Sequence, residues 1–128
     1  MSYYFSKRVK GSFEDVHKRV TASLKEEGFG ILNEIDVKAT LKKKLGVDFK
    51  KYKILGACNP QFAFKALQVE DKIGTMLPCN VILQEIGKGE IEVAAVDPVA
   101  SMKAIENKEL YGTAVQVQEK LKNAVDRL

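Results

Sequence analysis

Histidine and cysteine are scarce in this 128-residue sequence, with one and two copies respectively, and tryptophan is missing altogether. A single histidine excludes most catalytic triads and histidine-based metal sites. The chain also lacks a glycine-rich phosphate loop, a His-Glu-x-x-His helix and a nucleophile elbow. The one histidine, His17, lies beside the apolar side of a predicted helix, and we assign it no role. An enzyme built from this sequence would therefore depend on carboxylates, lysines or thiols.

The sequence also lacks a long hydrophobic run. No window approaches the roughly 18 apolar residues that a membrane span needs, and the first residues have no signal-peptide core. We therefore expect a cytoplasmic protein that does not associate with membranes. Because the cytosol is reducing, Cys58 and Cys79 are expected to be free thiols rather than a disulfide.

Positive charge is only slightly in excess. The sequence has 21 Lys and Arg residues and 17 Asp and Glu residues, which gives a formal net charge of +4. The densest basic cluster runs from Lys42 to Lys53 and contains no arginine, which favours a solvated surface over a nucleic-acid site. Weak nucleic-acid binding through this cluster remains an alternative. It would require an affinity that falls steeply as the salt concentration rises.

The pattern of apolar residues predicts a single α+β domain over residues 1–128, without a linker or an internal repeat. A residue suited to capping precedes each of four predicted helices. A fifth helix is predicted at the C-terminus, where apolar residues recur at four- and three-residue steps and should pack on the protein's own sheet. The predicted strands cover residues 2–9, 29–35, 53–57, 81–86 and 91–96, and the four capping residues are Ser12, Asp36, Asn59 and Asp97.

Two stretches of the chain place a Cys-Asn pair beside a proline: Cys58-Asn59 before one, and Cys79-Asn80 after another. If the strands that carry these pairs are neighbours, two thiols and two carboxamides converge. They would offer soft metal ligands or a reactive thiolate whose pKa falls at a helix N-terminus. The alternative is structural, because cysteine is often buried and this spacing fits no zinc motif. In that case Asn59 and Asn80 satisfy local backbone groups.

Several acidic and basic residues are further candidates. Asp97 precedes a proline, which favours a helix-capping role over a role as a functional acid. Glu34, Asp36 and Lys38 lie close together at a predicted strand-to-helix junction, where charged groups usually serve as caps and surface ion pairs. We rank these three below the Cys-Asn pairs.

Five stretches of the sequence occur in this order: Gly28-Phe29-Gly30, Glu34-Ile35-Asp36-Val37-Lys38, Leu55-Gly56-Ala57-Cys58-Asn59-Pro60, Leu77-Pro78-Cys79-Asn80-Val81 and Val96-Asp97-Pro98-Val99. Together they resemble the domain-of-unknown-function 302 family over most of the chain from Gly28 to Met102. The resemblance implies an antiparallel sheet with helices packed on one face, similar to a TATA-binding-protein half-domain, and it implies a homodimer. It implies no reaction and no cofactor.

Three functional hypotheses follow. The first is a homodimeric binding module that holds a small ligand or a metal ion near Cys58, Asn59, Cys79, Asn80 and Asp97. The second is a small enzyme that uses the thiolate of one of the two cysteines. The third is nucleic-acid binding through the lysine cluster. The sequence identifies no catalytic residue, cofactor or metal, so enzymatic activity stays an open question.

Overall fold

Five antiparallel strands form a sheet in the order β1-β5-β4-β3-β2 in the computed structural model, which describes residues 2–128. All neighbouring strands are antiparallel, and β4 and β5 form the predicted hairpin with Gly89 in the left-handed region of its turn. The α+β fold class is therefore confirmed. The strands are β1 (Tyr4–Lys10), β2 (Gly30–Asp36), β3 (Tyr52–Cys58), β4 (Cys79–Gly87) and β5 (Glu90–Val96).

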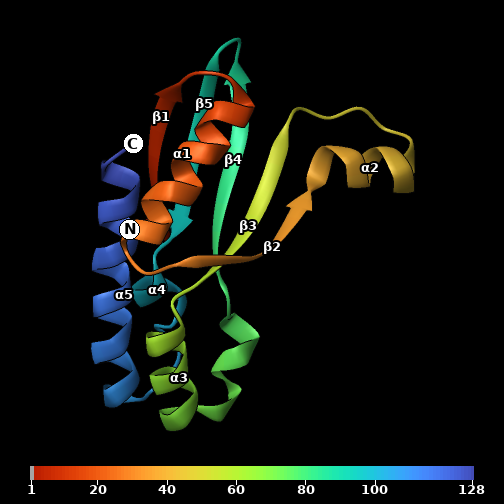
Figure 1. Cartoon of the computed structure of the whole chain (residues 1–128). Helices are drawn as coiled ribbons and strands as arrows, with labels where there is room; N and C mark the ends of the chain where they lie inside the picture. The colour runs from red at the N-terminus through yellow and green to blue at the C-terminus, as the bar shows by residue number, and fades with distance from the viewer. Residues whose placement is uncertain (1) are drawn as a thin grey trace.

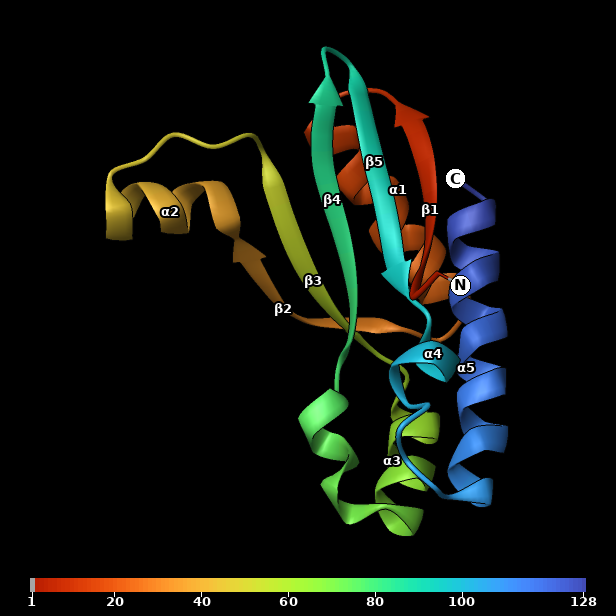
Figure 2. The same cartoon turned by 180° about the vertical axis from the view of Figure 1, so that it is seen from behind.

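Helices α1 and α5 cover one face of the sheet, whereas no helix of residues 2–128 lies over the other face (Figures 1 and 2). We call this uncovered side the open face. No helix in the described part of the chain is both long and apolar enough to cross a membrane. The helices are α1 (Phe13–Glu26), α2 (Val37–Leu45), α3 (Pro60–Val69), α4 (Pro98–Ser101) and α5 (Lys108–Asp126), with a 3₁₀ helix η1 (Asp71–Met76) after α3.

Three of the predicted capping residues begin their helices with a side-chain hydrogen bond. Ser12 Oγ accepts from the Asp15 amide at 3.1 Å, and Asp36 Oδ1 accepts from the Ala39 amide at 2.9 Å. Asp97 Oδ1 accepts from the first amides of α4. These bonds satisfy amides that lack a partner within the helix, which is why the helices start at these positions.

The main hydrophobic core lies between the sheet and helices α1 and α5. Alternate residues of β4 and β5 point toward the helices, as the two-residue period of a strand requires. The apolar side of α5 packs here, so the prediction that this helix covers the protein's own sheet is confirmed. The core includes Val16, Val20 and Leu24 from α1, Val81 and Leu83 from β4, Ile91 and Val93 from β5, and Val117 and Leu121 from α5.

A second, smaller hydrophobic cluster lies beyond the end of the sheet, where α3, η1 and the first half of α5 come together (Figure 1). Its buried members are Ala66, Ile73 and Leu110. The 3₁₀ helix that supplies Ile73 was not predicted. Leu67, on the same helix as Ala66, is 43% exposed and lies outside this cluster.

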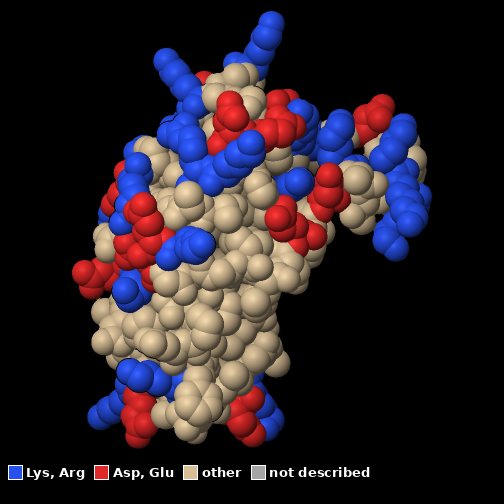
Figure 3. Space-filling view, in the orientation of Figure 1, with Lys and Arg blue, Asp and Glu red and all other residues tan. Residues whose placement is uncertain are grey.

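Residues 32–50, which we call the arm, project from the β2 edge of the sheet (Figures 1 and 2). None of the nine residues of α2 is buried, although the helix is capped at Asp36 and ends at Gly46 in the left-handed region. Large apolar side chains of the arm are exposed, among them Leu32 at 67% and Leu45 at 69%. Lysines crowd the same segment (Figure 3).

Candidate functional site

The ends of β3 and β4 meet α3 and α5 around a small apolar cavity of about 40 Å³. Ala57 and Cys79 are cross-strand partners, so the strands that carry the two Cys-Asn pairs are neighbours, as the sequence hypothesis required. Members of both hydrophobic clusters line the cavity, with Phe29 and Val117 from the main core and Ala66 from the smaller one. The cavity thus lies at the boundary between the two clusters.

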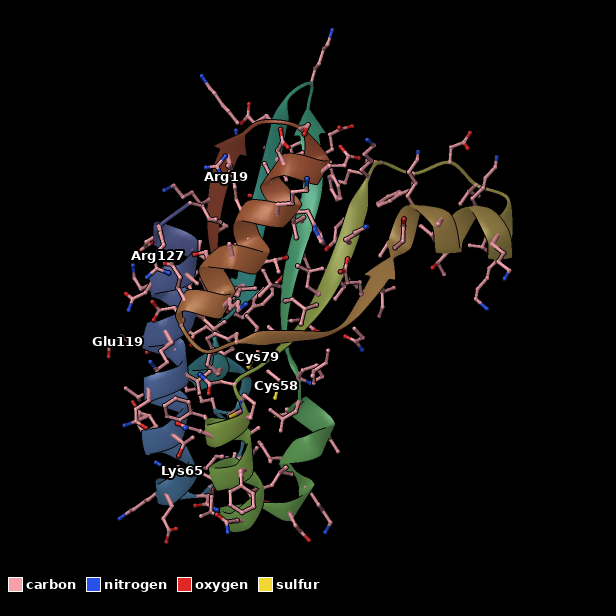
Figure 4. All side chains as sticks on the ribbon, in the orientation of Figure 1. Arg19, Cys58, Lys65, Cys79, Glu119 and Arg127 are labelled. Atoms are coloured by element: carbon pink, nitrogen blue, oxygen red, sulfur yellow. The ribbon has the colours of Figure 1, made fainter. Side chains whose placement is uncertain are left out.

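Both thiols line this cavity, at the end of the sheet nearest α3 (Figure 4). Cys79 is buried, and its burial together with the nearby Cys58 raises the pKa of the Cys79 thiol to about 11. Burial also raises the pKa of the half-buried Cys58 thiol. The expected lowering of a thiol pKa by the N-terminus of α3 was therefore wrong, because desolvation disfavours the thiolate more strongly. At neutral pH both groups are protonated.

Asn59 does not cap α3 with its side chain, contrary to the sequence prediction. Its Nδ2 donates to the backbone carbonyl of Glu27 at 3.1 Å, which joins the start of α3 to the turn that follows α1. Gly28 lies in that turn at φ +88, and a Cβ there would lie 3.0 Å from Asn59 Nδ2. The left-handed backbone and the close approach both require glycine. The amides at the start of α3 consequently have no side-chain cap.

Asn80 and Cys79 point to opposite sides of β4. Asn80 is exposed on the open face, where it shares a shallow groove with Tyr4 and Ile82. This separation follows from the alternation of side chains along a strand. The expectation that two carboxamides join the two thiols was therefore wrong for Asn80.

Asp97 belongs to a neighbouring groove of about 510 Å³ rather than to the thiol cavity. Besides capping α4, its carboxylate accepts hydrogen bonds from Gln118 Nε2 at 3.0 and 3.2 Å. The groove and the cavity share Met102, Leu110 and Ala114 as a common wall. Asp97 therefore lies next to the cavity while serving a structural role.

The lower-ranked candidates Glu34, Asp36 and Lys38 do not line the thiol cavity, and each contacts other residues of the chain. Glu34 Oε1 lies 2.8 Å from His17 Nε2 and 3.7 Å from Lys53 Nζ. Asp36 caps α2, and Lys38 Nζ donates to the Phe49 carbonyl at 2.7 Å. The His17–Glu34 contact was not predicted, because it depends on the packing of β2 alongside α1.

Sequence reasoning also missed the walls of the cavity, including Met102 and Leu110. The available signal was the pair of small residues Ala63 and Ala66, spaced three apart on α3, which leaves space where a larger side chain would fill it. Among residues 2–128, no group of three or more His, Cys, Asp and Glu side chains is placed to hold a metal ion.

The fold and this cavity define a small α+β domain with one open sheet face and a thiol-lined apolar site. The family model described as domain of unknown function DUF302 matches residues 5–128, and the chain belongs to this family. The resemblance drawn from the sequence is thereby confirmed, whereas the likeness to a TATA-binding-protein half-domain stays a prediction.

Among solved structures, the chain is similar to the crystal structure of an uncharacterized conserved DUF302 protein from Bacillus stearothermophilus. The two are 27% identical, with a TM-score of 0.91 over 99% of this chain and 98% of that chain. No curated protein matches the chain. The similarity extends over the whole domain.

Proposed function

We propose that this protein is a binding module and that its ligand, a small molecule or a metal ion, occupies the thiol cavity. The observation that supports this most directly is the cavity itself, unfilled by side chains and lined by Cys58 and Cys79. Protein interiors are close-packed, and voids larger than a water molecule are few in a domain. A cavity of about 40 Å³ between two hydrophobic clusters is therefore unusual, and a bound ligand would account for it.

The chemistry of the walls restricts the ligand. A buried water needs two to four polar partners, and an apolar void without them stays dry. Most of the lining side chains, such as Phe62 and Leu110, are apolar. The polar ones are few: Asn59, whose Nδ2 already donates to the Glu27 carbonyl, and Thr113. The ligand is accordingly a group of a few apolar or soft atoms, in contact with two neutral thiols.

Xenon, an apolar monatomic probe, is expected to bind in the cavity and to shift the methyl NMR signals of Ala57 and Ala114, which lie in its walls. Ala66→Leu fills part of the space and should abolish these shifts. Ala104→Leu, at an exposed turn position, is the matched control and should leave them unchanged. Both variants must keep the far-UV circular dichroism of the wild type. Shifts that are equally large in the Ala66→Leu variant would refute the proposal.

Native mass spectrometry of freshly purified protein complements the xenon experiment. A defined additional mass that is retained in the folded protein and lost on denaturation identifies a natural occupant. Its disappearance in the Ala66→Leu variant, with retention in Ala104→Leu, would assign that occupant to the cavity.

We further propose that the module works as a homodimer joined through the arm. An isolated helix of nine residues is marginal in water, and α2 has no buried residue to stabilise it within its own chain. The open face presents an apolar row that crosses four strands in register and begins in the arm. It consists of Ile35, Ile54, Ile82 and Ala94. A second copy of the chain would cover both the arm and this row by two-fold symmetry.

The variant Leu45→Glu is expected to convert the dimer to a monomer, because it replaces an exposed apolar side chain of the arm with a charged carboxylate. Leu67→Glu serves as the matched control, since Leu67 is also an exposed helical leucine but lies on α3. Sedimentation velocity measures the result. A wild type that is monomeric at every concentration, or a Leu45→Glu variant that remains fully dimeric, contradicts the proposal.

The two alternatives have less support. For a thiol enzyme, the raised pKa values of Cys58 and Cys79 reduce the thiolate available at neutral pH. For nucleic-acid binding, lysines of the basic cluster lie beside carboxylates, with Lys42 next to Asp48. A mobility shift that weakens steeply with salt would restore the nucleic-acid hypothesis.

A further inference from the structure

Three sulfur-containing side chains line the thiol cavity. They comprise both cysteines of the sequence, Cys58 and Cys79, and Met102, one of its three methionines. Each comes from a different part of the fold: Cys58 ends β3, Cys79 begins β4, and Met102 is the C-cap residue that follows α4. The fold therefore gathers sulfur from three separate parts of the chain at a single cavity.

The remaining walls contain no carboxylate and no imidazole. Magnesium and calcium require oxygen ligands, and a structural zinc site takes four nitrogen or sulfur ligands, so none of these ions suits the cavity. Thiolate and thioether ligands together select Cu(I), a soft ion that is satisfied by few donors. A cavity of about 40 Å³ has room for a single ion.

We propose that the thiol cavity is a Cu(I) site in which Cys58, Cys79 and Met102 supply the sulfur ligands. This inference rests on the proposed binding function and names the class of its ligand. Binding is a ligand exchange without oxidation or reduction: Cu(I) leaves its carrier, both thiols bind as thiolates and their protons pass to the solvent. The copper stays in the +1 state throughout.

The start of α3 contributes to the same site. Two thiolates and one Cu(I) carry a net negative charge, which is costly in an apolar cavity unless a positive partner lies nearby. Asn59 also lines the cavity, and α3 begins immediately after it without a side-chain cap. The free amides and the positive end of the helix dipole therefore lie beside Cys58.

A competition experiment tests the site. Reduced protein is titrated without oxygen against a chromophoric Cu(I) chelator. The wild type is expected to withdraw one equivalent of Cu(I) and to gain the ultraviolet absorption of a copper-thiolate bond. Cys58→Ala and Cys79→Ala should each weaken the affinity at least about tenfold.

Substitution of Met102 distinguishes the proposed three-sulfur site from copper binding by the two thiols alone. Met102→Leu keeps the size and apolar character of the side chain but removes the sulfur, and it is expected to weaken the affinity about tenfold. Met76→Leu is the matched control, because Met76 is exposed on η1 outside the cavity, and it should leave the affinity unchanged. Equal affinities for the Met102→Leu and Met76→Leu variants would overturn the three-sulfur site.

Failure of this inference is distinguishable from failure of the binding function. If xenon binds in the cavity while wild type competes for Cu(I) no better than a Cys58→Ala/Cys79→Ala double variant, the copper site is wrong and the binding module stands. If xenon and Cu(I) both fail to bind, both proposals fall. Silver(I), which resists oxidation, gives a second measurement by native mass spectrometry on the wild type alone, and a single bound Ag(I) is expected.

Discussion

Replacing Gly56 with alanine is expected to lower the free energy of unfolding by about 1–3 kcal/mol, the usual cost of forcing extra volume into a packed interior. Gly56 is buried in β3, next to the strand end that carries Cys58. A Cβ at this position would overlap Asn33 Oδ1 and would lie 2.8 Å from Cγ of Pro78. Asn33 can rotate away, but the proline ring cannot, so much of the strain remains.

Gly30→Ala is the matched control for this prediction. Gly30 is an exposed strand residue with open space around it, so the added methyl group should change the stability by less than about 0.5 kcal/mol. Urea denaturation measures both variants. Adding Asn33→Ala to Gly56→Ala should recover only the part of the loss that comes from the Asn33 overlap. Equal stabilities of the Gly56→Ala and Gly30→Ala variants would show that the close approach of Pro78 is not a constraint.

Raising the pH from about 8 to about 10.5 is expected to cost the metal-free wild type about 2 kcal/mol of stability through Cys79 alone. The pKa of this thiol rises from an ordinary value of 9.0 to about 11 in the folded protein. A raised pKa means that the unfolded chain loses its proton first. The contribution of Cys79 is therefore fully present below pH 9 and is lost as the pH approaches 11.

Other groups, mainly lysines and tyrosines, titrate in the same range, so the comparison is with Cys79→Ala. The variant starts from a lower stability because a buried side chain has been shortened, but its decline with pH should be shallower than that of the wild type by about 2 kcal/mol. Parallel profiles for the two proteins would mean that Cys79 is accessible to water in the folded state.

The features that the sequence predicted well are local ones. Ser12, Asp36 and Asp97 cap their helices through amides two or three residues away, so neighbouring sequence is sufficient to identify them. The β4-β5 hairpin and the apolar side of α5 likewise follow from short-range patterns. The family resemblance also predicted the fold class.

The features that were missed depend on residues distant in sequence. Asn59 is of a residue type that often caps helices, yet its side chain donates to the carbonyl of Glu27, 32 positions away. That carbonyl comes within reach only after α1 and β3 have packed together. The cavity likewise joins Met102 to Cys58, and no local pattern links them. The orientation of Asn80 was within reach of sequence analysis, since alternation along β4 already places it opposite Cys79.

The position of the cavity between the two hydrophobic clusters has a thermodynamic consequence for the whole domain. Elements that share few contacts can open independently. The smaller cluster of α3, η1 and the start of α5 is separated from the main core in part by the cavity, which reduces the contacts between them. An occupant would make contacts with both clusters at once and would bind only when both are folded. Its binding free energy would then be added to the stability of the domain, amounting to about 2.7 kcal/mol at a hundredfold excess over Kd. Occupancy and cooperative unfolding are, on this view, linked in one equilibrium.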